Sequence, residues 1–395
     1  MNNFDKNLFH LNQFDSLLLA PGPVQLHPEV QKILAEPMIH HRTPAFDQIL
    51  KSTLQDLKYL FQTEQDVFIL TSTGSGGMEC LLVNVLHPQS QVMVVVSGKF
   101  GERWAEMAET FLKPFSASSK VHIFQVPWGE KLDLKSFQEY LNHHPEIDLV
   151  MTQACETSTG TLHPIKEMSD IVQKTKALFI VDAITALGAT ELKMDEWGID
   201  GIIAGSQKAI MLPTGLSLLS YSKKAWQVIN NNSLPRYYFD IRKEKKANEK
   251  GETFFSSNVS LIKALHFVLQ QIKAQTLPVL INEIKNRAHY TKHMASFLNL
   301  KIYSQSPSPS LTALTTPVGI DSQRLREHIE KNHHITLMGG QDNLKGKIIR
   351  IGHMGYILDE HLHRTSIAIA KSMIDMNVPI DLNQVVFESK KYLKF

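Results

Sequence analysis

The chain has 395 residues, of which 43% are hydrophobic and 20% are charged, as is typical of a globular protein with about two or three domains. Its 41 basic and 39 acidic residues give a formal net charge of +2, so no strong overall field would recruit nucleic acid or a membrane surface. The two cysteines, Cys80 and Cys155, are too few for a disulfide framework and favour a reducing compartment.

The ends of the chain carry no common targeting pattern. No basic segment followed by an apolar core opens the sequence, and Asp5 and Asp15 are unfavourable in a mitochondrial presequence. The final KKYLKF is not a peroxisomal address, and no apolar run is long enough to span a membrane. We therefore expect a cytoplasmic protein.

The first distinctive segment is LLLAPGPVQLHPE at residues 17–29, where Pro-Gly-Pro interrupts an apolar run. The prolines stiffen the chain and the glycine allows close backbone approach, although taken alone the segment is most simply an entry turn. Residues 40–44, HHRTP, contain two adjacent histidines. They have no acidic or cysteine partners at ligand spacing, so we predict no metal site there.

Residues 65–73 form an apolar run that predicts a strand, followed by Gly-Ser-Gly-Gly at residues 74–77 and a helical pattern. A strand, a glycine-rich turn and a helix start offer free N–H groups and a positive dipole end to a phosphate. The turn is not a nucleotide-binding P-loop, because GxxxxGK[ST] is absent. We predict that Gly74, Ser75 and Gly76 bind a phosphate.

Further strands are predicted at residues 91–97, 120–127 and 148–152. They alternate with an amphipathic helix, for which Asp133 is the predicted N-cap, and with a crossover helix at residues 165–176. Alternating strands and helices indicate an α/β fold with a mainly parallel sheet.

Two short apolar runs, at residues 177–181 and 201–204, end on polar groups. The first leads to Asp182 and the second to Gly-Ser-Gln-Lys, which ends at Lys208. Buried parallel strands would deliver this carboxylate and this amine to the sheet edge where open α/β sheets bind ligands. A desolvated lysine is suited to a Schiff base and an aspartate to a pyridine nitrogen, so the pattern indicates a pyridoxal phosphate site. The alternative is a structural ion pair.

The C-terminal half begins with a predicted strand at residues 218–222, LLSYS, and continues to a charge run, RKEKKANEK, at residues 242–250. We expect the charge run to be a solvated loop. Residues 260–298 predict a long helical region that breaks at Leu277-Pro278.

Residues 347–352, KIIRIG, predict a strand in which Arg350 points away from the face shared by Ile349 and Ile351. An arginine on a rigid strand is suited to hold a carboxylate through two parallel hydrogen bonds. The alternative is an ordinary surface arginine.

The sequence resembles the class V pyridoxal phosphate enzymes of the alanine–glyoxylate and serine–glyoxylate or serine–pyruvate aminotransferase group. The resemblance rests on VDAITALGA, on GIDGIIAGSQKAIMLPTGLS, and on the HRTP, KFGERW, ETSTG and IRIG segments, in matching order over nearly the whole chain. It implies fold type I, with an N-terminal arm at residues 1–20 and a large domain at 21–265 built on a mainly parallel seven-stranded sheet. A linking helix at 266–295 and a smaller α+β domain at 296–395 would follow.

The resemblance also implies pyridoxal 5'-phosphate as the cofactor, with Lys208 as its Schiff-base residue, Asp182 at the ring nitrogen and no metal. It implies a homodimer with active sites at the interface, where Thr253 and Ser256 reach the partner's phosphate. Relatives more often have Thr-Pro where Ser256-Ser257 stands, and many have tryptophan where Phe100 stands. The implied cofactor-binding residues are Gly74, Ser75, Gly76, Phe100, Ser158, Asp182, Gln207, Lys208, Thr253 and Ser256. The implied substrate-binding residues are Arg350, Ser158 and Gly22.

The implied reaction is transamination from alanine or serine to glyoxylate or pyruvate. One alternative is transamination between 2-aminoethylphosphonate and pyruvate. Another is a non-catalytic pyridoxal phosphate-binding accessory protein, since some family members are labelled as hydrogenase-associated subunits. Cysteine desulfurase chemistry is nearly excluded, because neither Cys80 nor Cys155 stands where a nucleophile on a C-terminal mobile loop is required.

Overall fold

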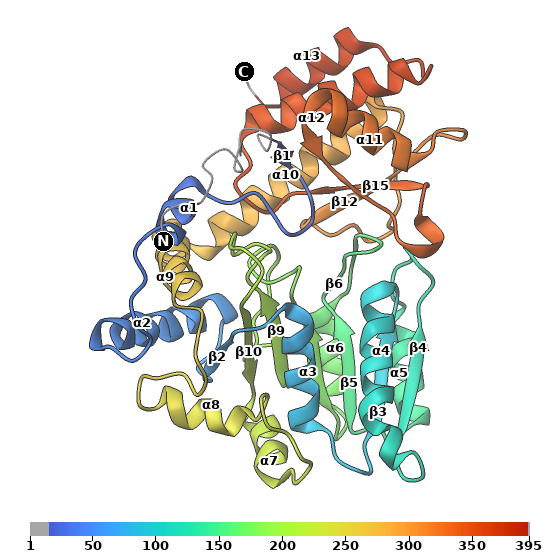
Figure 1. Cartoon of the computed structure of the whole chain (residues 1–395). Coiled ribbons are helices and arrows are strands. Elements are labelled where there is room, and N and C mark those ends of the chain that lie inside the picture. Colours follow the sequence, from blue (N-terminus) through green and yellow to red (C-terminus); the bar gives the residue numbers. More distant parts are fainter. Residues whose placement is uncertain (1–15, 394–395) are drawn as a thin grey trace, which may run out of the picture.

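The computed structural model describes residues 16–393, and the two sheets that organise it are seen one above the other in Figure 1. The larger sheet has seven strands. In spatial order they are β2 (Val67–Leu70), β10 (Ser217–Tyr221), β9 (Gly201–Gly205), β8 (Leu178–Asp182), β5 (Leu149–Gln153), β3 (Gln91–Val96) and β4 (Lys120–Gln125). The prediction of a mainly parallel seven-stranded sheet is therefore confirmed.

Only β10 runs against its neighbours, pairing antiparallel with both β2 and β9. It follows β9 through a short connection, which returns the chain beside the strand that it has just left. The pairs among β9, β8, β5, β3 and β4 are parallel, and β2 runs in the same direction as these strands because it is antiparallel to β10. Their carboxyl ends therefore lie at one edge of the sheet, the edge that faces the smaller sheet in Figure 1.

Helices cover both faces of the large sheet, which explains why its central strands are apolar throughout rather than alternating. One face packs against α3, α4 and α7, and the opposite face packs against α2, α5, α6 and α9. Their bounds are α2 (Pro44–Phe61), α3 (Gly74–Val85), α4 (Lys99–Leu112), α5 (Leu134–His143), α6 (Ile165–Val172), α7 (Lys223–Asn231) and α9 (Val259–Gln275). As predicted, Asp133 caps α5 by accepting a hydrogen bond from Ser136 N at 2.9 Å.

The charge run after β10 corrects one prediction, because residues expected to form a solvated loop form α8 (Ile241–Asn248). Asp240 caps the helix through its side chain, and Ile241 and Glu244 are buried against the protein. Glutamate, lysine and alanine are good helix formers, so one apolar anchor and one cap were enough to order the segment. The high charge content of the segment favoured a loop in the sequence interpretation, so the helix was not predicted.

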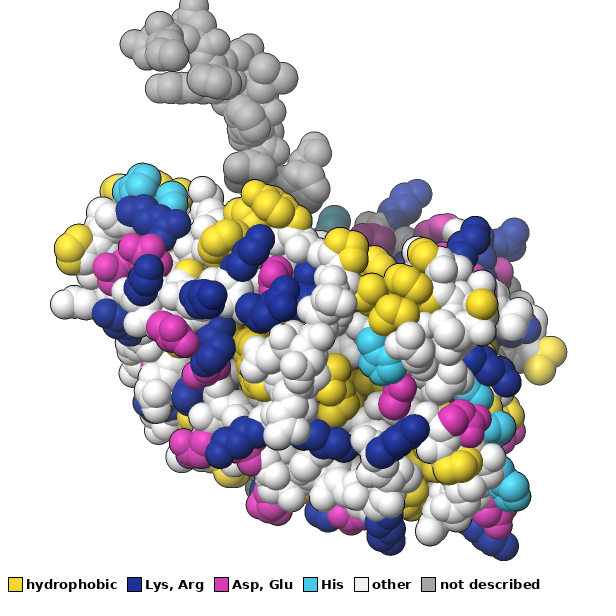
Figure 2. All heavy atoms as spheres, turned by 90° about the horizontal axis from the view of Figure 1, so that it is seen from below, with side chains coloured by type: hydrophobic (Ala, Val, Ile, Leu, Met, Phe, Trp, Pro, Cys, Tyr) yellow, Lys and Arg dark blue, Asp and Glu magenta, His cyan; other side chains and the backbone are white. Residues whose placement is uncertain are grey.

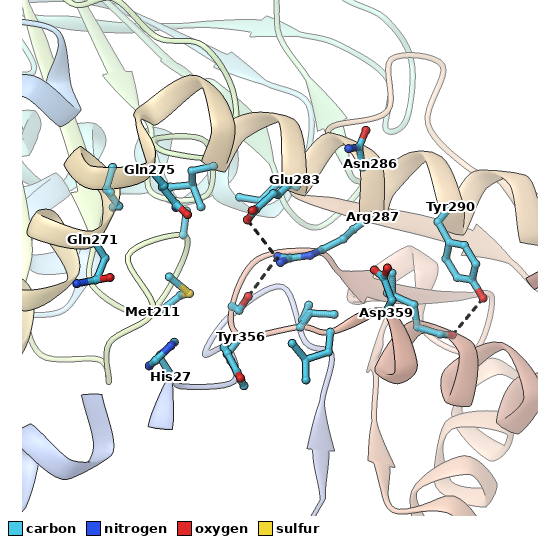
Figure 3. Close-up of a pocket in the computed structure, with 18 of the residues that line it drawn as sticks. His27, Met211, Gln271, Gln275, Glu283, Asn286, Arg287, Tyr290, Tyr356 and Asp359 are labelled. Atoms are coloured by element: carbon cyan, nitrogen blue, oxygen red, sulfur yellow. Dashed lines mark hydrogen bonds and ion pairs between the residues drawn. The ribbon is translucent and has the colours of Figure 1, made fainter. Parts of the chain in front are cut away.

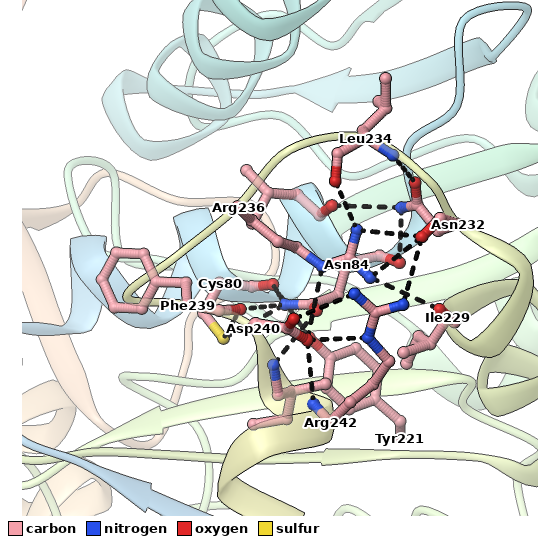
Figure 4. Close-up of polar contacts among 12 residues, drawn as sticks. Cys80, Asn84, Tyr221, Ile229, Asn232, Leu234, Arg236, Phe239, Asp240 and Arg242 are labelled. Atoms are coloured by element: carbon pink, nitrogen blue, oxygen red, sulfur yellow. Dashed lines mark hydrogen bonds and ion pairs between the residues drawn. The ribbon is translucent and has the colours of Figure 1, made fainter. Parts of the chain in front are cut away.

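A polar network joins the start of α8 to the C-terminal half of α3 (Figure 4). The side-chain amide of Asn84 donates to the carbonyls of Phe239 and Cys80, both at 2.7 Å, and its oxygen accepts from Ile241 N at 3.3 Å. Tyr221 in β10 donates to the same Cys80 carbonyl at 2.9 Å. Because α3 begins at the glycine-rich turn, these contacts also fix the position of that turn.

The predicted break at Leu277-Pro278 is confirmed, since α9 ends at Gln275 and α10 (Leu277–Phe297) begins directly after Thr276. Thr276 has φ +75°. Two further helical elements are α1 (Pro28–Leu34), which packs on α9, and a short 3-10 turn at Lys113–Phe115.

The smaller sheet is antiparallel and packs against α10, α11, α12 and α13. Its strands in order are β11 (Lys301–Ile302), β12 (Leu311–Thr315), β15 (Ile348–Gly352) and β14 (Met338–Gly339), and its other helices are α11 (Ser322–His333), α12 (Asp359–Asp375) and α13 (Leu382–Leu393). The remaining short elements are β6 (Cys155–Glu156), β7 (Thr161–Leu162) and a 3-10 turn at Asp342–Leu344.

The N-terminal segment reaches this smaller unit. Strand β1 (Leu17–Leu18) pairs in parallel with β13 (Ile335–Thr336). Residues 1–15 of the expected arm lie outside the described residues. The domain boundaries at 20, 265 and 295 remain a prediction.

Basic and acidic side chains are interspersed over the face seen in Figure 2, in keeping with the small net charge. None of the helices between residues 16 and 393 combines the length and the apolar character that a membrane crossing needs.

Candidate active site

The carboxyl ends of β8 and β9 bring Asp182 and Lys208 to the same edge of the large sheet. Asp182 is the last residue of β8, and Lys208 follows the end of β9 by three residues. The two strands are parallel neighbours. Both side chains are buried, with 5% of Asp182 and 8% of Lys208 exposed.

The Pro21-Gly22 segment lies directly against the amine of Lys208. Its Nζ donates a hydrogen bond to the carbonyl of Pro21 at 2.9 Å. Gly22 has φ +131°, and a Cβ added there would lie 2.6 Å from Nζ. Glycine is therefore required at position 22 both for its backbone conformation and for space.

Burial also makes the charged form of the Lys208 amine less favourable. It lowers the pKa of Lys208 from 10.5 to about 8, an effect that nearby Asp182 opposes and that Arg350 reinforces. A substantial neutral fraction near pH 8 gives the amine the lone pair that a nucleophile or general base needs.

Asp182 lies in a site that is poor for a carboxylate without a cationic partner. Its Oδ1 accepts a hydrogen bond from Ile184 N at 2.8 Å. Burial nevertheless raises the pKa of Asp182 from 3.8 to about 7, and Glu156 adds to the rise. A protonated ring nitrogen in contact with the carboxylate would stabilise its charged form.

The glycine-rich turn forms the first turn of α3, where the N–H groups of Gly74 and Ser75 have no acceptor within the helix. The N–H of Gly76 is already capped by Thr73 Oγ1 at 3.4 Å. A Cβ on Gly74 would lie 2.7 Å from Ile184 Cδ1, so the turn is close to the segment that follows Asp182.

Gln207 directly precedes the lysine in the chain, and its Oε1 would lie 2.8 Å from a Cβ added to Gly205. Its Oε1 is buried and has no hydrogen-bond partner among the described residues. Free first-turn N–H groups and a buried carboxylate and amine fit a molecule that carries a phosphate and a protonated ring, and the amide N–H groups of Gln207 are the part of that side chain able to donate to a phosphate.

Arg103, which the sequence interpretation quoted within KFGERW but did not weigh, contacts this turn. Its Nη1 donates to Ser75 Oγ at 3.1 Å, and its Cζ lies 5.0 Å from the centre of the half-buried Phe100 ring. Arg103 is also among the charges that lower the pKa of Asp182. Its spacing three residues after Phe100 on a helix was the available signal.

Glu156 is a second residue that the interpretation missed. It is fully buried, and Oε2 accepts from the N–H groups of Phe100 and Gly101, both at 3.1 Å. Its Oε1 accepts from Ser158 N at 3.0 Å and from Ser158 Oγ at 2.5 Å. Burial raises the pKa of Glu156 against these four hydrogen bonds. The sequence signal that could have indicated this residue is a carboxylate in the segment that follows the predicted strand at residues 148–152, where an unpaired charge would be costly.

Ser158, expected to touch cofactor and substrate, is engaged within the protein. Besides donating to Glu156, its Oγ accepts from Lys99 N at 3.0 Å. A Cβ on Gly98 would overlap both Ser158 and Glu156. The segment around Ser158 therefore packs tightly onto the start of α4.

Arg350 reaches the same segment from the smaller sheet. Its Nε donates to the carbonyl of Gly339 at 2.8 Å and its Nη1 to the carbonyl of Thr157 at 2.9 Å. Burial lowers the pKa of Arg350 to about 10, so the side chain stays charged at neutral pH. Neither contact uses Nη2, which leaves donors for a ligand carboxylate.

Thr253 and Ser256 are the predicted residues that the chain does not bring to this cluster. Thr253 Oγ1 donates to the carbonyl of Phe255 at 2.8 Å, and Ser256 is exposed. Within residues 16–393, neither forms a hydrogen bond with Lys208, Asp182 or the 74–76 turn.

A pocket of about 800 Å³ lies behind the lysine, between α9, α10 and the chain before α12 (Figure 3). Ala209 and Met211 line it, but Lys208 and Asp182 do not. At its wall Arg287 donates to the carbonyls of His353 and Gly355 at 3.1 and 3.3 Å. The pocket is therefore separate from the candidate site.

Comparison with known proteins gives one family. Residues 25–377 match the family model described as aminotransferase class-V. A soluble hydrogenase 42 kDa subunit from Anabaena cylindrica is 36% identical over 351 residues, which cover 88% of this chain and 90% of that protein. An L-aspartate–glyoxylate aminotransferase from Paracoccus denitrificans is 30% identical over 386 residues, covering 95% of this chain and 96% of that protein.

Solved structures agree in fold with these matches. The crystal structure of alanine–glyoxylate aminotransferase from a Nostoc species superposes with a TM-score of 0.86 and 25% sequence identity. The match covers 94% of this chain and 100% of that one.

Proposed function

The chain belongs to the class V aminotransferases and is thus a pyridoxal 5'-phosphate-dependent transaminase, and we propose that it uses alanine or serine as donor and glyoxylate or pyruvate as acceptor. The observation that carries the proposal is the buried Arg350, which bonds the carbonyls of Gly339 and Thr157 and leaves Nη2 for a ligand carboxylate. One buried arginine beside the reacting amine suits substrates with one carboxylate. The glyoxylate named for the Paracoccus and Nostoc proteins supports a small acceptor.

When bound, the cofactor supplies an aldehyde that carries the amino group and a ring that takes up the electron pair left when the substrate Cα loses its proton. Lys208 would hold the aldehyde carbon until the substrate amine replaces it. The freed amine, neutral in part because it is buried, would then move the proton from the substrate Cα. Asp182 would face the ring nitrogen and keep it protonated.

The remaining residues would position the two partners. Gly74 and Ser75 would offer first-turn N–H groups to the phosphate, with Gly76 and Gln207 beside them. Phe100 would lie against the ring, and Arg350 would hold the substrate carboxylate. Ser158 and Gly22 would line the remaining space, where Gly22 leaves the amine accessible.

We also propose that the enzyme is a cytoplasmic homodimer in which Thr253 and Ser256 complete the partner's phosphate site. Exposed aromatic side chains beside this loop support a protein contact, with Tyr237 72% and Phe254 39% exposed. Lys243 lies 4.7 Å from the Tyr237 ring centre. Free, buried Cys80 and Cys155 accord with a reducing compartment.

The test begins with borohydride reduction of the holoenzyme and peptide mapping, which should find the cofactor on Lys208. Half-reactions followed by cofactor absorbance, over a panel of amino acids, then define the donor. We expect L-alanine or L-serine to convert the spectrum and glyoxylate or pyruvate to restore it. Conversion only by 2-aminoethylphosphonate would favour that alternative substrate instead.

The hydrogenase-subunit name of the Anabaena relative keeps an accessory role as the second candidate. It predicts a protein whose cofactor spectrum responds to no amino acid. The buried Arg350, whose Nη2 takes no part in its two protein contacts, supports chemistry, because a cofactor that meets no substrate gives no use for a carboxylate-binding group.

A further inference from the structure

A cluster of two imidazoles and a carboxylate lies at the edge strand of the large sheet, apart from the active site. His122 belongs to β4, and His144 and Glu146 follow the end of α5. Glu146 Oε1 lies 3.1 Å from His144 Nδ1 and 4.0 Å from His122 Nε2. One ligand atom from each of the three side chains lies within 4.8 Å of the others.

The scaffold holds these side chains in place. His122 is buried, because Phe124 on the same face of β4 packs edge-on against Phe137 of α5, which covers this face. The ring of His144 lies 5.0 Å from that of His122 and 4.6 Å from that of Tyr140. The cluster thus has one ligand on a strand and two on the adjoining connection, separated by a single residue.

We propose that His122, His144 and Glu146 form a binding site for a divalent transition metal, with Zn²⁺ preferred. Two imidazoles and a carboxylate are a common zinc donor set and a poor one for Mg²⁺ or Ca²⁺, which select oxygen ligands. Ligand atoms of a tetrahedral zinc site stand about 3.3 Å apart, so the carboxylate and His122 need to approach by less than about 1 Å. Both Glu146 and His144 lie on the surface side and can move.

Gln91 extends the site on the neighbouring strand. Its Oε1 lies 3.3 Å from His122 Nε2. The amide oxygen or a water would take the fourth position. Bound metal would tie the edge strand to the connection between α5 and β5, and edge strands are the part of a sheet most open to fraying and unwanted pairing.

The site is tested by calorimetric titration of tag-free holoenzyme with ZnCl₂ in a non-chelating buffer. We expect one equivalent with a micromolar dissociation constant, weakened at least about tenfold in His144→Asn and in Glu146→Gln. These surface ligands are preferred to His122, whose replacement in the packed interior could unfold the strand.

His143→Asn is the matched control, because this exposed neighbour bonds the Glu139 carbonyl at 2.7 Å and lies outside the cluster. This control should bind zinc with the affinity of the unmodified protein. Zinc bound at any other site would contribute equally to all the titrations and would not explain a difference between the variants. X-ray absorption of the loaded protein should show two imidazoles in the first shell. Equal zinc affinity in all four proteins, or none tighter than about 0.1 mM, would mean an adventitious ion only and overturn the proposal.

Discussion

Lys208 is a buried amine whose hydrogen-bond acceptor is a backbone carbonyl and not a carboxylate. Burial makes the protonated form of such a group unfavourable, and the lowered pKa of about 8 reflects this free-energy penalty. The fall from 10.5 corresponds to about 3 kcal/mol, since one pKa unit equals about 1.4 kcal/mol. The fold therefore keeps a destabilising residue in its interior, and the proposed Schiff-base role of Lys208 gives a reason for keeping it.

Lys208→Met should consequently stabilise the cofactor-free protein while abolishing transamination. After about 1 kcal/mol is allowed for the hydrogen bond lost by Pro21, we expect a gain of about 2 kcal/mol in unfolding free energy at pH 7. The unfolded chain binds the extra proton between pH 8 and 10.5, so the stability of the unmodified protein rises with pH there and the gain shrinks.

Urea unfolding of both cofactor-free proteins at pH 7 and pH 10 measures this difference. Lys223→Met, on an exposed lysine at the start of α7, is the control and should change little. A Lys208→Met protein less stable than the unmodified one at pH 7 would contradict the argument.

Among single residues, Lys208, Asp182 and Arg350 could be predicted from sequence as site residues. The first two follow the ends of apolar strands, and the alternation of a strand puts Arg350 on the face opposite to its isoleucine neighbours. Glu156 and Arg103 could not be predicted. Their roles come from contacts across 55 and 28 positions, to Gly101 and to Ser75, that no local pattern encodes. The resemblance implies that Ser158 binds cofactor and substrate, yet its hydroxyl donates to Glu156 and accepts from Lys99 N.

At the scale of elements, Glu156 in β6 connects this strand to the start of α4 through its side-chain hydrogen bonds. Each carboxylate oxygen serves two donors, one pair on Phe100 and Gly101 and the other on Ser158. A glutamine has one oxygen, so it satisfies one pair and leaves at least one buried N–H unpaired. The cost of an unpaired buried donor is about 1–3 kcal/mol.

Glu156→Gln should therefore loosen the ring of Phe100 without removing any group that is expected to touch the cofactor. We expect about tenfold weaker cofactor binding and a smaller induced circular dichroism of the bound cofactor. Glu109→Gln, at an exposed position of the same helix, is the matched control. Unchanged affinity and dichroism would show that this carboxylate does not position the ring.

The elements themselves were largely predictable from sequence. Doubly covered strands are apolar along their whole length, and glycine, proline and capping residues mark the boundaries between them. Helix α8 was missed because it is anchored mainly by Ile241, with Glu244 buried beside it, and its other charged residues read as solvent-exposed. Its stability depends on the local cap by Asp240 and on the tertiary contact between Ile241 N and the side-chain oxygen of Asn84.

Over the whole molecule, the site is assembled from parts that are far apart in the chain. Pro21 and Gly22 come from the N-terminal segment, Asp182 and Lys208 from the large sheet, and Arg350 from the small one. The hydrogen bond from Arg350 to the Thr157 carbonyl spans 193 positions and joins the two sheets directly. The position of Arg350, the proposed substrate-binding arginine, therefore depends on how the two sheets are held together, which sequence pattern alone does not specify.

Whether Thr253 and Ser256 act within their own subunit or across a dimer is a question about the whole assembly, and mixing two inactive variants can answer it. We would mix Lys208→Ala protein with a Thr253→Ala, Ser256→Ala double variant, each with little activity at limiting cofactor. In a hybrid dimer, the subunit that retains Lys208 would receive an unaltered loop from its partner. If the loops cross, random exchange should restore about a quarter of the unmodified sites, because half of the dimers are hybrid and each has one complete site.

If the loops instead serve their own subunit, every site in the mixture lacks either the lysine or the loop, and mixing restores nothing. Mixing two batches of Lys208→Ala protein is the blank, and exchange is verified by mass spectrometry of isotopically labelled subunits. Recovery requires the loop of one chain at the phosphate turn of another. That contact would give a use to a loop whose Thr253 hydroxyl bonds only within the loop and whose Ser256 faces solvent in the chain described here.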